Sequence, residues 1–157
     1  MAYEIERKFL LKSDVWREQV TQTLSIKQAY FCNTDKASLR VRVSDQNGYL
    51  SSKTMTRKIR RHEFEYAIPL ADAEFMIMHM CQGSPIIKQR HLVKMNQQLW
   101  EIDEFEGDNS GLIVAEIELA HEDEPFSRPD WLGQEVSDDV RYMNMSLVLN
   151  PFKLWTT

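Results

Sequence analysis

Six pairs of like-charged residues, each pair separated by one position, recur along stretches of this chain that alternate as β-strands do. They are Glu4/Glu6, Arg40/Arg42, Glu63/Glu65, Lys88/Arg90, Glu101/Asp103 and Glu116/Glu118. Alternate side chains of a strand point to opposite faces of a sheet, so each pair lies on one face. Like charges that are neighbours on a sheet face repel each other. The pattern therefore predicts that acidic strands are interleaved with basic ones, or that the face binds ligands of opposite charge.

The positions between these charges are largely apolar, most clearly from Leu39 to Val43 and from Ala115 to Leu119. Such side chains require a core, which helices can supply, and the charged face is then the other side of the sheet. If the sheet curls closed, the charges line its interior. That interior must hold water, because burying an ion in a dry core is strongly unfavourable. The alternative is an ordinary sheet whose charges only face bulk water.

A hydrated interior of this kind suits two ligands at once. Arginine and lysine bind phosphate oxygens well, and carboxylates suit hard cations such as Mg²⁺ or Mn²⁺. The joint prediction is a site for a metal-chelated polyphosphate.

Alternation and turn signals predict where the elements lie. Strands are expected over residues 1–10, 24–31, 38–43, 49–54, 61–68, 86–93, 99–105 and 112–119. Helices are expected over residues 14–20, 70–81 and 138–149, the second opened by Pro69 and the third capped by Ser137. Asn47-Gly48 predicts a hairpin turn, and residues 127–133 a short turn. The basic run at residues 57–61 is expected to be a solvated loop rather than a phosphate site.

Length and charge narrow the class of protein. The chain has 157 residues, enough for a single domain with its own core over residues 1–157. Its net charge of -5 argues against nucleic acid or an acidic membrane surface as a partner. No apolar run approaches a membrane span, and no secretory signal is evident. Cys32 and Cys81 lack any CxxC spacing, so we expect reduced thiols and a cytoplasmic location.

The charged positions resemble the signature of the CYTH domain proteins, also called triphosphate tunnel metalloenzymes. Glu4, Glu6 and Lys8 match the N-terminal Glu-x-Glu-x-Lys of that family, and the later pairs follow in the same order with Lys53. The stretch Leu132–Ser137, with Arg141, Tyr142 and Asn144, is similar to the ending of the short bacterial members. The resemblance implies an α+β fold: an eight-stranded antiparallel closed β-barrel, or tunnel, with helices packed outside and a C-terminal helix near one mouth.

The resemblance also implies roles for individual residues. Phosphate-binding residues would be Lys8, Arg40, Arg42, Lys53, Lys88, Arg90 and, closing over the phosphate from the last helix, Arg141. One or two Mg²⁺ or Mn²⁺ ions would be held by Glu4, Glu6, Glu63, Glu65, Asp103, Glu116 and Glu118. Glu101 lies outside the family pattern, and its place in the tunnel is expected from parity alone.

Motifs for other chemistry are absent from the sequence: there is no Walker loop, no Gly-x-Ser-x-Gly elbow and no Rossmann fingerprint. Metal-assisted attack by water on a linear triphosphate remains, with Glu4 or Glu118 as the carboxylate that takes the proton. Lys8 is counted with these two as catalytic as well as phosphate-binding.

Inorganic tripolyphosphate is the favoured substrate, because the compact chain and its ending look most like the short bacterial tripolyphosphatases. The alternatives are a class IV adenylate cyclase, a thiamine triphosphatase, and a polyphosphate-binding module without activity. A homodimer is plausible for the fold.

Overall fold

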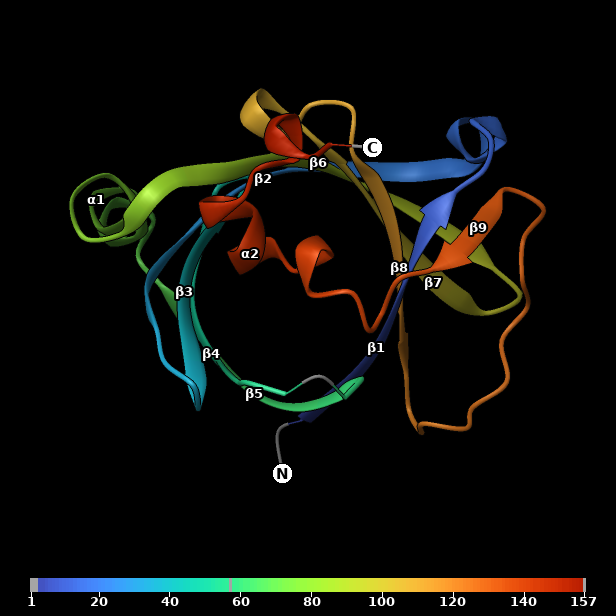
Figure 1. Ribbon diagram of the computed structural model, residues 1–157, viewed down its shortest axis with the longest axis horizontal. Helices are drawn as coiled ribbons and strands as arrows, with labels where there is room; N and C mark the ends of the chain where they lie inside the picture. Colours follow the sequence, from blue (N-terminus) through green and yellow to red (C-terminus); the bar gives the residue numbers. More distant parts are fainter. Residues whose placement is uncertain (1–2, 57, 157) are drawn as a thin grey trace.

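The computed structural model describes residues 3–56 and 58–156. Within these residues one nine-stranded antiparallel sheet has the order β5-β4-β3-β2-β6-β7-β8-β1-β9. The strands are β1 (Tyr3–Leu11), β2 (Val20–Asn33), β3 (Ala37–Ser44), β4 (Asn47–Thr54), β5 (Arg60–Ile68), β6 (Gln82–Met95), β7 (Gln98–Phe105), β8 (Ile113–Leu119) and β9 (Leu132–Glu135). Pairing of β1 with β5 closes the first eight into a barrel, seen end-on in Figure 1. The predicted eight-stranded closed barrel is therefore confirmed.

A tight hairpin sets the register of β3 and β4. The β3–β4 turn consists of Asp45 and Gln46, since Ser44 pairs with Asn47, and Asp45 has a φ of 52°. The hairpin was predicted at this place, but its turn lies two residues before Asn47-Gly48. Gly48 instead lies in β4, where an added Cβ would be 2.9 Å from the Cβ of Ala73. Its missing side chain therefore lets a helix approach the sheet closely.

That helix is α1 (Leu70–His79), which packs on the outer face of the barrel beside β3 and β4 (Figure 1). Ala73 and Ile77 are buried there against Ala29, Val41 and Val43. This contact confirms a helix outside the barrel. It also accounts for the apolar face of residues 39–43.

A larger core lies outside the opposite wall, over β7, β8 and β1. Trp16, Trp100 and Trp131 are its largest members and are at most 1% exposed. Trp16 comes from the 3₁₀ helix η1 (Val15–Gln19), and β9 covers another part of this core. The sequence predicted a turn where β9 lies; the strand forms because Leu132 and Glu135 pair with β1 and Gly133 fits against the Leu10 carbonyl.

The C-terminal segment crosses one mouth of the barrel (Figure 1). It consists of η3 (Val140–Tyr142), α2 (Asn144–Leu149) and η4 (Phe152–Leu154), shorter pieces than the predicted helix over residues 138–149. The break falls at Met143, whose φ of −70° and ψ of 134° are extended rather than helical. Leu147 of α2 packs on Ile86, Phe105 and Val114, which share the interior face of their strands with the charged residues. A C-terminal helix at one mouth is thus confirmed.

Candidate active site

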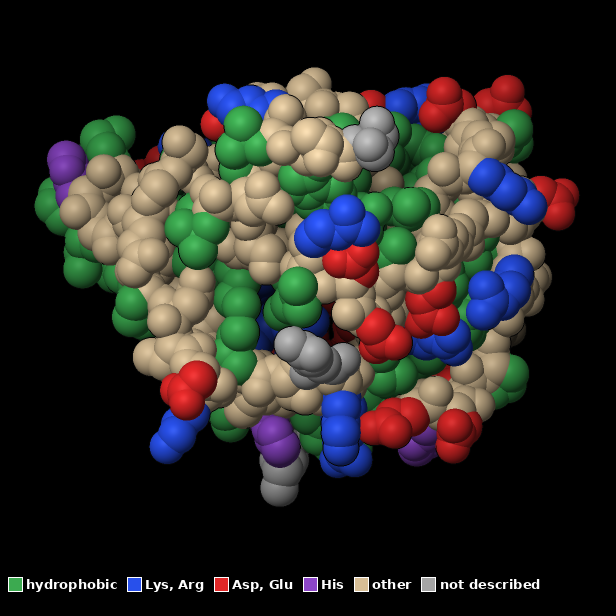
Figure 2. Space-filling model, in the orientation of Figure 1, with side chains coloured by type: hydrophobic (Ala, Val, Ile, Leu, Met, Phe, Trp, Pro, Cys, Tyr) green, Lys and Arg blue, Asp and Glu red, His purple; other side chains and the backbone are tan. Residues whose placement is uncertain are grey.

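The like-charged pairs converge inside the barrel. Register sets Lys8 opposite Glu116, Arg90 opposite Asp103, and Lys53 opposite Glu63, so basic and acidic strands are neighbours. A cavity of about 190 Å³ lies between them, and each of its described lining residues is polar: Glu4, Glu6, Arg40, Arg42, Lys53, Glu63, Glu65, Lys88, Arg90, Glu101, Glu116, Glu118 and Asn144. Figure 2 shows basic and acidic side chains at the base of a hollow on the face that α2 crosses. The alternative of charges facing only bulk water does not fit this arrangement.

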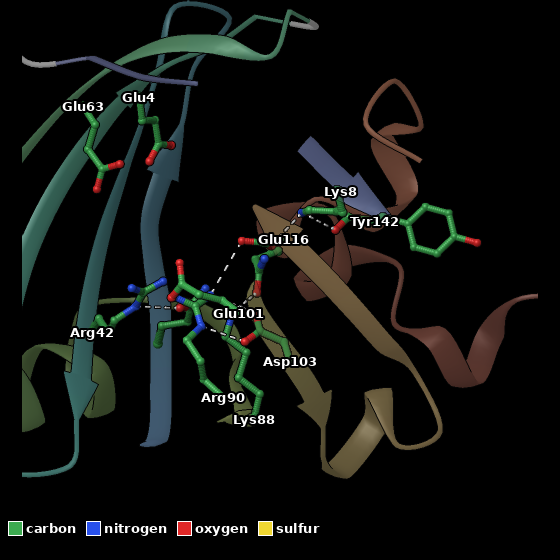
Figure 3. A network of polar contacts seen from close by, with 12 residues as sticks. Glu4, Lys8, Arg42, Glu63, Lys88, Arg90, Glu101, Asp103, Glu116 and Tyr142 are labelled. Carbon is green, nitrogen blue, oxygen red and sulfur yellow. Dashed lines mark hydrogen bonds and ion pairs between the residues drawn. The ribbon is translucent and has the colours of Figure 1, made fainter. Parts of the chain in front are cut away.

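Asp103 organises the most buried part of the site (Figure 3). Its carboxylate is fully buried and accepts hydrogen bonds from Arg90 Nε at 2.7 Å, Arg90 Nη2 at 2.9 Å and Lys88 Nζ at 2.7 Å. Burial alone would raise the pKa of Asp103, but Arg90 and Lys88 outweigh it and hold that pKa below its usual range. Asp103 therefore stays ionised and fixes the orientation of the Lys88 and Arg90 side chains.

Lys88 and Arg42 are basic residues whose pKa is lowered by burial in the cavity. Burial, with Arg90 and Arg42 nearby, lowers the pKa of Lys88 to about 7 even though Asp103 opposes the shift. Loss of hydration, with Arg40 and Arg90 nearby, lowers the pKa of Arg42 to about 10. Within residues 3–56 and 58–156, Arg42 has no carboxylate in contact, and its Nε donates to Gln28 Oε1 at 2.9 Å. An anion bound here would supply the missing counter-charge.

Carboxylates gather around Lys53, away from Asp103. Lys53 Nζ contacts Glu4 and lies 3.4 Å from Glu63 Oε2. Figure 3 shows Glu4 and Glu63 side by side, and each carboxyl group affects the pKa of the other. Burial first, then Glu63, raises the pKa of Glu4; burial, Glu4 and Glu6 raise the pKa of Glu118. Without a bound metal ion, Glu4 and Glu118 therefore hold protons more tightly than usual, whereas the pKa of Glu63 is lowered despite its partial burial.

This donor set fits a divalent cation that is shared with a substrate. In the part of the chain that the structure describes, no three carboxylate, imidazole or thiol groups form a complete metal site on their own. Mg²⁺ is commonly held by one or two carboxylates together with substrate phosphates and water. Glu4, Glu6, Glu63 and Glu118 are the carboxylates whose environment suits that arrangement.

The other predicted metal ligands lie among the bases. Glu116 is 3.3 Å from Lys8 Nζ and 3.8 Å from Arg90 Nη2, and Glu65 Oε2 accepts from Arg40 Nη2 at 3.3 Å. Both oxygens of Asp103 are engaged by Lys88 and Arg90. Glu101, expected in the tunnel from parity, does line the cavity and accepts from Arg90 Nη1 at 2.8 Å.

Arg141 is the predicted phosphate ligand that the structure does not bring to the cavity. Its side chain is 53% exposed, and its Nη2 donates to Asp139 Oδ2 at 2.6 Å. The guanidinium also lies 5.1 Å from the ring of Trp155. These contacts hold it on the outer side of the C-terminal segment.

Three residues to which the sequence analysis gave no role lie at the site. Asn144 Oδ1 accepts from Lys88 Nζ at 2.9 Å, and the backbone oxygen of Tyr142 accepts from Lys8 Nζ at 3.1 Å, so the C-terminal segment is bound to two bases. Arg61 lies in β5 and faces the interior, two residues before Glu63. The basic run at 57–61 is therefore only partly the solvated loop that was predicted, and Arg57 lies outside the described residues.

The comparisons with known proteins agree with this geometry. The CYTH domain model matches residues 2–146. An inorganic triphosphatase of Acetivibrio thermocellus is 41% identical over 98% of this chain and 97% of its own length. An inorganic triphosphatase of Nitrosomonas europaea is 32% identical over 94% of this chain and 97% of its own.

A solved structure gives the same result for the fold. The crystal structure of an inorganic triphosphatase superposes with a TM-score of 0.68, covers 95% of this chain and 96% of its own, and is 31% identical.

None of the helices in residues 3–56 and 58–156 is long and apolar enough to cross a membrane. The barrel, the order of its charged pairs and the match along most of the sequence lead to one assignment: the chain belongs to the CYTH domain family.

Proposed function

We propose that this protein is a divalent-metal-dependent inorganic triphosphatase that hydrolyses tripolyphosphate inside its barrel. The single observation that carries the proposal is the convergence of seven basic residues and a separate group of carboxylates on two connected cavities in the barrel. The two inorganic triphosphatases that are similar over nearly the whole chain support the same activity. Mg²⁺ or Mn²⁺ is the proposed cofactor.

The bases would bind the triphosphate chain and neutralise it. Arg42 and Lys88 lack full compensation, and Lys8, Arg40, Lys53 and Arg90 can exchange carboxylate partners for phosphoryl oxygens. Such fixed cations stabilise the charge that develops on non-bridging oxygens during phosphoryl transfer. Asp103 would act through Lys88 and Arg90 by holding both in place.

The carboxylates would position and deprotonate the attacking water. Glu4 and Glu118 both have raised pKa values, which brings a carboxylate closer to the ideal for a general base near neutral pH. A divalent ion held by Glu4, Glu6, Glu63 and Glu118 would supply Lewis-acid polarisation of phosphate oxygens when bound.

Product analysis tests this function against its rivals. The protein is incubated with tripolyphosphate, ATP or thiamine triphosphate, each with Mg²⁺ and with Mn²⁺. We expect phosphate and diphosphate from tripolyphosphate as the fastest reaction. Cyclic AMP as the main product from ATP would instead indicate an adenylate cyclase, and tight binding without turnover a binding module.

A further inference from the structure

A second, smaller pocket opens from the main cavity beneath the C-terminal segment; we call it the end pocket. It has a volume of about 40 Å³ and is lined in part by Tyr30, Ser38, Ser51, Arg61, Met143 and Met145. It shares Glu6, Arg40, Lys53 and Asn144 with the main cavity, so the two are continuous. Glu4 and Glu118 line the main cavity but do not line the end pocket.

Two guanidinium groups in the end pocket are ready for an anion. Arg40 is only 7% exposed, and its Nε has no hydrogen-bond partner in the described parts of the chain. Arg61 makes no ion pair within residues 3–56 and 58–156, although its charge is close enough to lower the pKa of Glu6. A buried donor without a partner is unfavourable, which indicates that a ligand completes Arg40, and the half-buried Arg61 supplies a second positive charge in the same pocket.

The opposite wall of the end pocket is apolar and comes from the C-terminal segment. Met143 and Met145 are both half-buried and flank Asn144, whose side chain is hydrogen-bonded to Lys88. That hydrogen bond fixes the position of the segment over the pocket. The remaining space suits a few water molecules or one phosphoryl group, whereas pockets for organic ligands measure about 300 Å³ or more.

We propose that Arg61, Met143 and Met145 determine specificity by admitting only the unesterified end of a triphosphate. The inference rests on the proposed function, in which the attacked phosphoryl group lies beside Glu4 and Glu118. The other end of the triphosphate then lies in the end pocket, where Arg61 binds a terminal phosphoryl group that carries its full negative charge. In a nucleoside triphosphate bound the same way, the far phosphoryl group is esterified, and the two methionines block its nucleoside.

The test compares kcat/KM for tripolyphosphate and ATP in matched variants. The double variant Met143→Ala, Met145→Ala should raise the ATP-to-tripolyphosphate ratio by about tenfold, because each removed side chain opens space for the nucleoside. Arg61→Gln should lower kcat/KM for tripolyphosphate by about tenfold and change that for ATP much less, since a charge-assisted hydrogen bond is lost.

Matched controls lie nearby. Arg60→Gln changes the neighbouring residue of β5, whose guanidinium lies 4.2 Å from the ring of Tyr3, and Met78→Ala changes a methionine that is 72% exposed on α1. Neither should alter the ratio. Thermal unfolding of each variant shows whether it is folded. Because Arg61 is half-exposed, Arg61→Gln tests the proposal even if the variant without the two methionines does not fold.

Activity of the wild-type protein distinguishes the proposed function from the specificity role of the end pocket. If the wild-type protein releases no phosphate from tripolyphosphate, the proposed function is wrong and the end pocket has no substrate to select. If the wild type hydrolyses tripolyphosphate but the ratio is unchanged in the methionine variant and in Arg61→Gln, only the specificity role is overturned.

Discussion

Replacing Asp103 with Asn separates the two roles that this carboxylate can have. The family resemblance placed Asp103 among the metal ligands, whereas in the structure it is fully buried and receives three hydrogen bonds from Lys88 and Arg90. Asparagine has nearly the same shape but no charge, and its amide nitrogen cannot accept a hydrogen bond. The variant therefore leaves the buried guanidinium of Arg90 without its main counter-ion, whereas Lys88, whose pKa is about 7, can lose its proton.

The size of the effect follows from those contacts. Removing one partner of a buried ion pair typically costs about 3–5 kcal/mol, because the remaining charge is left uncompensated. Glu101 and Glu116 still contact Arg90 at 2.8 and 3.8 Å and offset part of that loss, so we expect about 3 kcal/mol. For a domain of this size such a loss lowers Tm by roughly 6–12 °C.

Urea unfolding at pH 7 without metal measures this loss directly. Asp108→Asn is the control, because its carboxylate pairs with Lys153 at 2.8 Å on an exposed site and should change stability by about 1 kcal/mol or less. In activity assays, Asp103→Asn should raise KM for tripolyphosphate and leave the half-saturating Mg²⁺ concentration unchanged. A stability loss as small as that of the control, together with a large shift in the Mg²⁺ requirement, would show that Asp103 binds metal instead.

Three further predictions follow from the charges in the barrel. Arg42→Gln should weaken tripolyphosphate binding about tenfold or more while leaving the free energy of urea unfolding equal or higher, because it removes a poorly compensated cation from the cavity. Without substrate, Mg²⁺ at 100 times its Kd should stabilise the protein by about 2.7 kcal/mol and raise its Tm above that of an NaCl control of equal ionic strength. The double variant Glu4→Gln, Glu63→Gln should abolish this rise in Tm. Folding lowers the pKa of Lys88 to about 7, so the unfolded chain binds more protons than the folded protein between pH 7 and 10. The free energy of unfolding should therefore rise with pH in this range, by at most about 1.4 kcal/mol per pH unit. Urea unfolding of Lys88→Met should show no such rise.

Parity of charged residues was enough to predict which side chains share the inner face of the sheet, whereas closure of that sheet into a barrel was predicted from the family resemblance. Lys8, Arg90 and Glu118 face inward because a strand places alternate residues on one face, and no long-range information is needed to see this. Elements that depend on distant partners were harder. β9 exists because Gly133 can lie against Leu10, more than a hundred positions away in the chain, and nothing in residues 127–133 signals that contact.

The site shows the same limit. Arg61 has the same parity as Glu63 and Glu65, so the alternation could have placed it inside, but its basic neighbours made a solvated loop the simpler interpretation. Arg141 failed to reach the cavity because Asp139, two residues earlier, holds it locally. The metal-ligand assignments, the catalytic roles and the single-domain prediction stay predictions.

The resting ion pairs explain why metal and phosphate should bind together. Lys53 contacts Glu4, Lys8 contacts Glu116, and Arg40 contacts Glu65, so each of these three basic residues already has an acidic partner. Phosphate bound alone would take the bases and leave carboxylates unpaired; a cation bound alone would leave the bases unpaired. Either state carries uncompensated charge in a cavity of limited hydration, whereas a metal-chelated triphosphate compensates both sets at once. By linkage, each ligand must then increase the affinity for the other by the same factor.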